Sequence, residues 1–320
     1  MDQFNQIVKQ EMGALDQVIR RDLDSNVPLI NAVGEYIIAA GGKRIRPLLT
    51  MLCGKLLGND SDLLYKIAAM VEYIHTATLL HDDVVDESGL RRGRATANAV
   101  FGNAASVLVG DFIYTRAFQM MVESNSLRVL KIMADSTNII SEGEVLQLLN
   151  IGRSDLTEAE YFKVIESKTA KLFEAGARVA AIISGADASQ EEHLANYAIY
   201  LGTAFQIVDD ILDYNSSAEI MGKNVGDDLL EGKVTLPLIY LLANGTPEMR
   251  AMVVAAIDNP KQADIAAIVN LVKTTKALDY CKNMAHDYVA RAQAELAVFA
   301  NNEYRQALEH IATLSVERLS

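Results

Sequence analysis

Two groups of aspartates are the side chains in this 320-residue sequence whose spacing could hold metal ions. Both follow the pattern Asp-Asp-x-x-Asp. With about 3.6 residues per helical turn, the first and fifth positions lie one turn apart on one face, so each motif presents three carboxylates together. The first motif comprises Asp82, Asp83 and Asp86, and the second comprises Asp209, Asp210 and Asp213.

Both motifs follow long apolar helical segments, which places them at predicted helix C-termini. Carboxylates are unfavourable at that end of the helix dipole, and like charges one turn apart repel by about a few tenths of a kcal/mol. A solvated acidic face or a helix cap is the ordinary alternative, but it explains one such motif better than two. A bound cation would offset both the unfavourable interaction with the helix dipole and the repulsion between the carboxylates. Because the candidate ligands are all oxygens, we expect Mg²⁺.

Mg²⁺ in proteins usually keeps waters and shares its shell with phosphate oxygens, so the motifs predict a diphosphate substrate. Residues 41–47, Gly-Gly-Lys-Arg-Ile-Arg-Pro, form a glycine turn with three cations before a predicted helix over 47–57. Free backbone amides and a positive helix end would face the same place as Lys43 and Arg46. We therefore predict an anion site there, with a solvated basic turn as the alternative.

Several further polar residues could complete a diphosphate site, although each is a weak signal alone. His75 lies seven residues before the first motif on the same helical face, where a satisfied core histidine is the ordinary interpretation. The glycine-punctuated segment 222–233 follows the second motif and could act as a lid, or be a surface loop. The other candidates are Arg91 and Arg92 after the first motif, Lys168 and Thr169 inside a predicted helical run over 161–181, Gln206 three residues before Asp209, and Lys223 and Lys233 in the possible lid.

Composition and periodicity predict an all-α protein. Half of the residues are hydrophobic, only five are proline, and apolar residues recur at helical spacing almost throughout. Breaks between these runs indicate about ten or more helices, which we expect to form a single-domain bundle over residues 1–320 around a central cavity. The net charge of −13 repels nucleic-acid phosphates, so we expect no nucleic-acid partner.

Cysteine use and the N-terminal residues indicate where the protein acts. Cys53 and Cys281 lie far apart in apolar helical patterns, so we expect no disulfide. The first residues lack the basic and apolar regions of a signal peptide, and the uncharged stretches are shorter than the roughly 20 residues of a membrane span. We therefore expect a cytoplasmic protein without a transmembrane segment.

The combination of these motifs, in this order, closely resembles the trans-prenyl diphosphate synthases, from about residue 30 to 240. The resemblance implies the helical isoprenoid synthase fold, a transferase activity and a homodimer. Residues 73–83 and 110–121 look most like the branch of the family that makes octaprenyl diphosphate for the quinone side chain. The resemblance rests on residues 41–47, the two aspartate motifs, Arg91-Arg92, Lys168-Thr169 and Phe205 to Asp210.

The resemblance also implies roles for individual residues. The six motif aspartates would hold Mg²⁺ ions that bridge an allylic diphosphate, with Arg91, Lys168 and Lys233 completing its shell. Isopentenyl diphosphate would bind against Lys43, Arg46, His75 and Arg92. Metal ions and fixed cations stabilise a departing diphosphate electrostatically, so no side-chain nucleophile is required. The direct participants expected in catalysis are Asp82, Asp83, Lys168, Asp209 and Asp210.

Product length should depend on the residues beneath the first motif. Thr78 and Ala77 precede Asp82 by four and five residues, or about 6 to 7.5 Å at helical rise. In the resembled family a bulky aromatic there stops growth early, so these small residues predict an open tunnel. We nominate Met121 and Met133 as its deeper floor, with ordinary core filling as the alternative.

Three other interpretations compete with a long-chain synthase. Terpene cyclases of the same fold usually replace the second aspartate motif and lack the Gly-Gly-Lys-x-x-Arg turn. A non-catalytic subunit of a two-component synthase would not require every motif position to be filled, as it is here. A synthase of shorter or other product length remains the main alternative, and the small Ala77 disfavours the shortest products.

Overall fold

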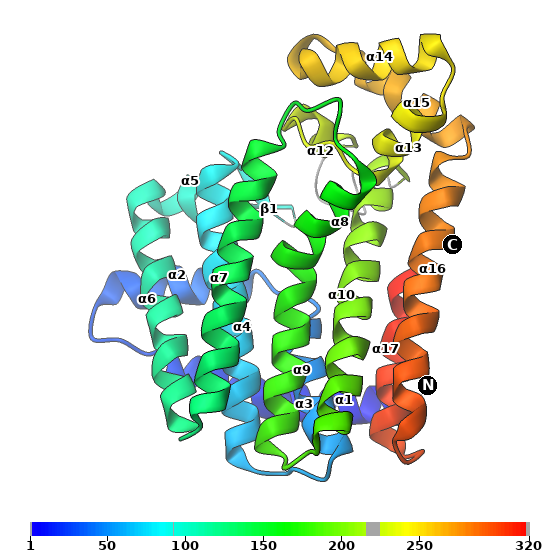
Figure 1. Ribbon diagram of the computed structural model, residues 1–320. Helices are drawn as coiled ribbons and strands as arrows, with labels where there is room; N and C mark the ends of the chain where they lie inside the picture. Colours follow the sequence, from blue (N-terminus) through cyan, green and yellow to red (C-terminus); the bar gives the residue numbers. More distant parts are fainter. Residues whose placement is uncertain (1, 92, 216–224, 318–320) are drawn as a thin grey trace. The chain divides into compact units, whose positions relative to one another are not determined.

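The computed structural model describes residues 2–91, 93–215 and 225–317, and these residues are overwhelmingly helical, as the sequence predicts (Figure 1). The chain folds into two compact units, each built from segments that are distant in the sequence. Unit 1 comprises Met1–Thr137, Leu172–Ala198 and Glu295–His310, and unit 2 comprises Asn138–Lys171, Ile199–Ala294 and Ile311–Ser320. Among the described helices, none combines the length and apolarity needed to cross a membrane.

Unit 1 contains the first aspartate motif and most of the N-terminal helices. Its central helix α4 packs against α1, α3, α5 and α6. The buried Tyr73 hydroxyl of α4 donates to the Ile19 carbonyl of α1 at 2.6 Å. The helices are α1 (Asp2–Asp22), α2 (Pro28–Ala39), α3 (Ile45–Leu56), α4 (Asp62–Val85), α5 (Ala97–Phe101), α6 (Asn103–Glu123), the first part of α7 (Leu127–Leu149), nearly all of α9 (Lys171–Ile183), the first part of α10 (Ala188–Asn215), a short 3₁₀ turn (Leu296–Val298) and part of α17 (Glu303–Glu317).

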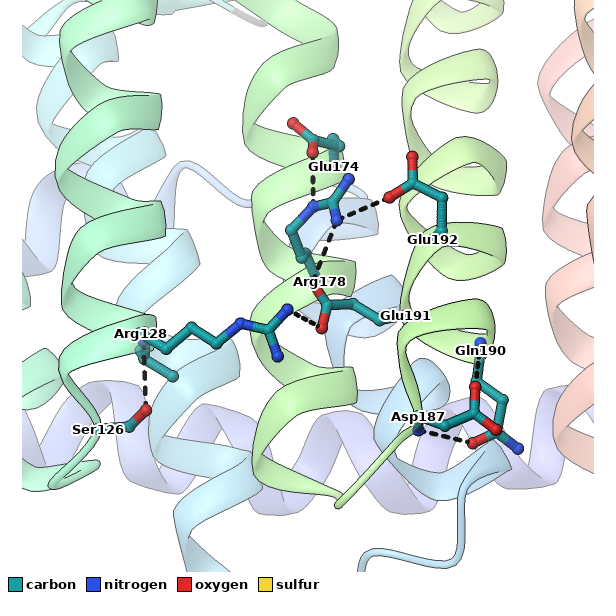
Figure 2. A network of polar contacts seen from close by, with 9 residues as sticks. Ser126, Arg128, Glu174, Arg178, Asp187, Gln190, Glu191 and Glu192 are labelled. Carbon is teal, nitrogen blue, oxygen red and sulfur yellow. Dashed lines mark hydrogen bonds and ion pairs between the residues drawn. The ribbon is translucent and has the colours of Figure 1, made fainter.

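A network of ion pairs joins three helices of unit 1 (Figure 2). Arg178 on α9 binds Glu174 one turn earlier, with 2.8 Å between Nε and Oε1. The buried Glu191 of α10 lies between two cations, at 3.1 Å from Arg178 and 2.6 Å from Arg128 at the start of α7. Because a buried carboxylate is costly unless it is paired, this network fixes the beginning of α7 to the α9–α10 pair.

Unit 2 contains the second aspartate motif. The short helix α13 contacts α8, α14 and α15. The helices are the end of α7, α8 (Glu158–Ile165), a π-helical turn (Glu166–Ala170), most of α10, α12 (Asp227–Leu230), α13 (Leu236–Asn244), α14 (Pro247–Asp258), a 3₁₀ turn (Pro260–Gln262), α15 (Ile265–Thr274), α16 (Ala277–Glu295) and the end of α17.

The structure differs from the sequence prediction at three local points. The helix predicted over 47–57 begins two residues earlier, at Ile45, so Pro47 lies inside its first turn. The helical run predicted over 161–181 is interrupted by the π-helical turn. A small antiparallel hairpin, β1 (Leu90–Arg91) with β2 (Arg94–Ala95), occupies the glycine-flanked break after the first motif. Such a short hairpin has too few residues for an alternating pattern to be recognised.

A capping box starts α8, the helix that leads into the π-helical turn. The Thr157 side chain accepts from the Glu160 N–H at 3.3 Å, and the Glu160 carboxylate accepts from the Thr157 N–H at 2.9 Å. These bonds from Thr157, together with Arg153, lower the pKa of Glu160 to about 2. The box is therefore complete above the ordinary pKa of a glutamate and is lost as the pH falls towards that lowered value.

Thr157→Ala should lower the free energy of unfolding by about 1 kcal/mol, because it removes the side chain that caps α8. Urea denaturation at neutral pH would measure the difference. Thr115→Ala is the control, since Thr115 is exposed in the middle of α6 and caps no helix. Equal effects of the two substitutions would contradict the capping role.

Candidate functional site

The first aspartate motif lies at the C-terminal end of α4, as predicted from the sequence. Asp82 and Asp83 occupy the last turn, and Asp86 is the C-cap residue, whose N–H donates to the Asp82 carbonyl at 2.8 Å. The last turn contains no basic residue, so α4 itself does not offset the charge of these carboxylates at its negative end. Asp82 and Asp86 are half-buried.

Asp83 differs from the other two residues of this motif because its side chain is fully buried. Arg91 on β1 places both Nε and Nη2 against Asp83 Oδ1, at 2.8 and 2.7 Å. Asp83 Oδ2 is buried without a hydrogen-bond partner. The two contacts from Arg91 therefore fix the direction of this carboxylate. Oδ2 remains an unused acceptor, which is costly in a buried position.

The glycine turn divides its three cations between different tasks. Arg44, in the left-handed region at φ 45°, forms ion pairs with Asp16 and Glu72 at 3.3 and 3.4 Å. Lys43 is exposed. Arg46 lies in the first turn of α3, where Nη1 is 3.3 Å from His75 Nε2 on α4. The structure thus brings together two residues of the predicted anion site, Arg46 and His75.

A ring from α9 supports this pair. The Arg46 guanidinium lies 4.6 Å from the centre of the Phe173 ring, a distance at which a cation and an aromatic face attract each other. Phe173 gave no signal in the sequence, because its position in an apolar helix is that of any core residue. The ring therefore holds the plane of the guanidinium in a fixed orientation.

The residues predicted to set product length are mainly buried in unit 1. Ala77 is 1% exposed, and Met121 on α6 and Met133 on α7 are fully buried. Thr78 is half-buried, and its hydroxyl donates to the His75 carbonyl at 2.9 Å. The ordinary alternative, core filling by the two methionines, fits their burial equally well. The tunnel assignment therefore stays a prediction.

The second aspartate motif occupies the last two turns of α10. Asp210 and Asp213 are each 3% exposed, whereas Asp209 is half-buried. Burial, followed by the nearby charge of Asp228 on α12, raises the pKa of both buried carboxyl groups above the ordinary value of an aspartate. Asp213 Oδ2 has no hydrogen-bond partner. The site is therefore strongly unfavourable for negative charge until a cation is present.

Both oxygens of Asp210 accept hydrogen bonds from neutral side chains. The Tyr161 hydroxyl of α8 donates to Oδ2 at 2.6 Å, and Gln206 Nε2 donates to Oδ1 at 2.8 Å. Gln206 Oε1 in turn accepts from the Thr169 hydroxyl at 2.9 Å. The structure thus joins three predicted residues into one network and adds Tyr161, which the sequence reasoning missed. Burial and the Asp210 charge raise the pKa of Tyr161 well above its ordinary value, so its hydroxyl remains a donor.

The π-helical turn carries Lys168 and Thr169. Lys168 Nζ lies 2.5 Å from Glu144 Oε2 and 2.9 Å from Gln147 Oε1, both on α7. Gly143 permits the close approach of the two elements, because a Cβ there would lie 2.8 Å from the Lys168 backbone nitrogen and 2.9 Å from Ser167 Cβ. Short π-helical insertions are frequent at functional sites, and this one displaces Lys168 from the position a regular helix would give it.

The possible lid segment is described only in part. Lys233 binds Glu231 at 2.7 Å, and the Gly226 N–H donates to the Asp213 carbonyl at 3.0 Å, which ties the described end of the segment to the second motif. Two predicted substrate ligands, Arg92 and Lys223, lie outside the described residues.

The donor sets of the two motifs fit a hard cation such as Mg²⁺. Each motif offers only carboxylates, and each has a buried oxygen without a partner, on Asp83 and on Asp213. Among the described residues, no three acidic, histidine or cysteine side chains lie within reach of one ion. Each ion would therefore need water or substrate oxygens to complete its shell, which is the usual way in which proteins hold Mg²⁺.

Comparisons with known proteins agree with these motifs. The polyprenyl synthetase family model matches residues 27–273. The chain is 48% identical to octaprenyl diphosphate synthase of Escherichia coli (strain K12), over 99% of both proteins. It is 43% identical to an all-trans-nonaprenyl-diphosphate synthase of Rhodobacter capsulatus, over 98% of this chain and 96% of that protein.

Solved structures show the same relationship. A polyprenyl synthase from Caulobacter crescentus CB15, crystallised with calcium and isoprenyl diphosphate, has a TM-score of 0.95 and 44% identity, covering 100% of this chain and 98% of that one. A decaprenyl diphosphate synthase from Rhodobacter capsulatus has a TM-score of 0.93 and 41% identity, covering 100% and 99%. The family match and the full-length identities show that this chain belongs to the polyprenyl synthetase family and is a prenyltransferase.

Proposed function

We propose that this prenyltransferase condenses an allylic diphosphate of the farnesyl type with successive isopentenyl diphosphates and releases all-trans octaprenyl diphosphate. The observation that carries the choice of product is the 48% identity, over nearly the whole chain, to an octaprenyl diphosphate synthase. Ala77 is buried and small, whereas a bulky aromatic at this position would stop growth of the chain early, so Ala77 supports a long product. A nonaprenyl product is the second candidate, because a relative of that name is 43% identical.

The two motifs and the π-helical turn would hold the allylic substrate. Mg²⁺ would supply positive charge that stabilises the departing diphosphate. Lys168 and Lys233 bind Glu144 and Glu231 in this structure, so a diphosphate would compete with these carboxylates for the two ammonium groups. Arg91 would hold Asp83 in place and donate to the diphosphate with its remaining N–H groups.

The second substrate would bind to the glycine turn and α4. Lys43, Arg46 and His75 supply the donors for the diphosphate of isopentenyl diphosphate. The allylic C–O bond breaks, diphosphate leaves with the electron pair, and the double bond of isopentenyl diphosphate attacks the allylic carbon to form the new C–C bond. Loss of a proton from the condensed product then restores a double bond. Exclusion of water is essential because water would capture the cation.

We further propose that Mg²⁺ is the physiological ion and that the two units act as one catalytic domain. The polyprenyl synthetase family model matches residues 27–273, which include parts of both units, and the Caulobacter structure contains calcium together with isoprenyl diphosphate. The buried free thiols Cys53 and Cys281 are typical of a reducing compartment, so we place the enzyme in the cytoplasm, in synthesis of the quinone side chain.

We also propose a homodimer. Three large apolar side chains on α6 and at the start of α7 are strongly exposed, namely Leu108, Val122 and Leu127, at 66%, 60% and 85%. Exposed apolar residues on neighbouring elements are typical of a surface that another chain covers. Sedimentation of the purified protein would measure the oligomeric state.

Removal of divalent ions should abolish condensation. We would incubate the enzyme with farnesyl diphosphate and isopentenyl diphosphate, with Mg²⁺ or with chelator, and determine the products by mass spectrometry. We expect a C40 diphosphate that disappears with chelator and returns with added Mg²⁺. A C45 product would favour the nonaprenyl alternative, and products of C15 to C20 would favour a short-chain enzyme. An absence of condensation would favour the interpretation as a non-catalytic subunit, and a cyclised hydrocarbon product would indicate a cyclase.

A further inference from the structure

Tyr161 is a buried polar residue of unit 2 that none of the proposed catalytic roles uses. It lies in α8, one residue before Phe162, and its side chain is 3% exposed. The two rings make an edge contact with their centres 5.3 Å apart, and Phe162 contacts Tyr288 of α16 at 5.7 Å. Packing on this side therefore fixes the direction in which the Tyr161 hydroxyl points.

That hydroxyl is the end of a continuous hydrogen-bonded chain. It donates to Asp210 Oδ2 at 2.6 Å, Asp210 Oδ1 accepts from Gln206 Nε2 at 2.8 Å, and Gln206 Oε1 accepts from Thr169 at 2.9 Å. The chain thus runs from α8 through α10 to the π-helical turn. Each member is oriented by its neighbour, because the Gln206 amide must present N–H to Asp210 and oxygen to Thr169.

Asp210 cannot be held in one direction by Gln206 alone. A carboxylate with a single donor can rotate about its Cβ–Cγ bond, whereas two donors on opposite oxygens define its plane. The neighbouring Asp213 shows the contrast, because its Oδ2 is buried without a partner. In contrast to Asp213, Asp210 is therefore held on both oxygens by side chains of the protein.

We propose that Tyr161 is a positioning residue for the second aspartate motif, which acts through Asp210 to fix Gln206 and Thr169 for the allylic diphosphate and its metal ions. The inference rests on the proposed function, since it assigns these residues to the allylic side of the reaction. It predicts an effect confined to that side. The residues proposed for isopentenyl diphosphate, Lys43, Arg46 and His75, belong to unit 1 and take no part in the chain.

Tyr161→Phe tests the proposal, because it removes only the hydroxyl and retains the ring packing. Because the substitution removes one of the two hydrogen bonds that hold Asp210, we expect about a 10- to 100-fold loss in kcat/KM for the allylic diphosphate. The Mg²⁺ concentration for half-maximal activity should rise about tenfold, while the KM for isopentenyl diphosphate stays within about twofold. Calorimetric titration of the substrate-free enzyme with Mg²⁺ supplies a readout that does not depend on turnover, and we expect weaker binding.

Tyr280→Phe is the matched control. The Tyr280 hydroxyl of α16 donates to Glu158 at 2.8 Å, so this substitution also removes one tyrosine hydroxyl that binds a carboxylate near α8. It should leave the Mg²⁺ dependence and both KM values unchanged. If Tyr280→Phe shifted them as much as Tyr161→Phe, the effect would be a general loss of packing and the proposal would be wrong.

A double-mutant cycle with Asp210→Asn decides whether Tyr161 acts through Asp210. We expect the effects of Tyr161→Phe and Asp210→Asn to be strongly non-additive, since an asparagine keeps only one of the two acceptor oxygens that Asp210 uses and both substitutions therefore disturb the same pair of hydrogen bonds. Additive effects would overturn the proposal. Urea unfolding shows whether Tyr161→Phe is folded; a variant that did not fold would point to a general structural role for the hydroxyl and overturn the proposal. An inactive wild type would refute the proposed function, whereas an active wild type with an unaltered Tyr161→Phe variant would refute only the role of Tyr161.

Discussion

Ala77→Tyr is expected to shorten the main product from C40 to about C15–C20. Ala77 lies five residues before Asp82 on α4, which is about 7.5 Å along the helix axis, and its side chain is 1% exposed. A tyrosine there would fill the space through which we propose that the growing chain passes. Mass spectrometry of the products made from farnesyl or geranyl diphosphate measures the change directly.

The length distribution is a sound readout even if the variant is less stable. Overpacking a buried site costs about 1–3 kcal/mol, which lowers the amount of folded enzyme but not the ratio of products made by the molecules that fold. Ala77→Ser serves as the control, because it adds only one small atom and should retain the long product. An unchanged product from Ala77→Tyr would show that the chain does not pass this position, and Met121 and Met133 would then be ordinary core residues.

Gly143→Ala is expected to lower kcat/KM for the allylic diphosphate by about 100-fold, because a displacement of about 1 Å at a catalytic group can have an effect of that size. The new Cβ would meet the backbone nitrogen of Lys168 and the Cβ of Ser167, neither of which can move without shifting the π-helical turn. Steady-state kinetics with varied allylic diphosphate would measure this loss. Thermal or urea unfolding should show a cost of about 1–3 kcal/mol.

Gly13→Ala is the matched control for this substitution. Gly13 lies in α1, and a Cβ there would have no atom within 4 Å. Replacing a helical glycine by alanine in open space should stabilise the protein by roughly 0.5–1 kcal/mol and leave catalysis unchanged. If Gly143→Ala behaved like Gly13→Ala, the close approach of α7 would have no bearing on Lys168.

Much of the site could be predicted because its signal is local in the sequence. The two aspartate motifs, the apolar helices before them and the basic glycine turn are contiguous patterns, and the structure confirms that both motifs lie at helix C-termini. Helical periodicity likewise indicated the all-α class. These predictions required only the spacing of neighbouring residues along one helix.

The features that were missed depend on contacts between distant segments. Tyr161 looks like any core aromatic until α8 is placed beside the end of α10, where its hydroxyl meets Asp210. The π-helical turn was predicted as regular helix, because one extra residue in a turn leaves no clear trace in an apolar pattern. The pairing of Arg91 with Asp83 depends on the hairpin of β1 and β2, which is too short to recognise in advance.

Each unit contains one free cysteine, whose alkylation can report local unfolding of that unit. Cys53 belongs to unit 1 and Cys281 to unit 2, and both side chains are fully buried. Burial raises the pKa of each thiol, so neither is a reactive thiolate while its surroundings are folded. Alkylation in the folded protein therefore requires local opening, and mass spectrometry of the labelled peptides would give a separate opening rate for each unit. The order in which the two peptides are labelled would reveal whether the units unfold together or one after the other.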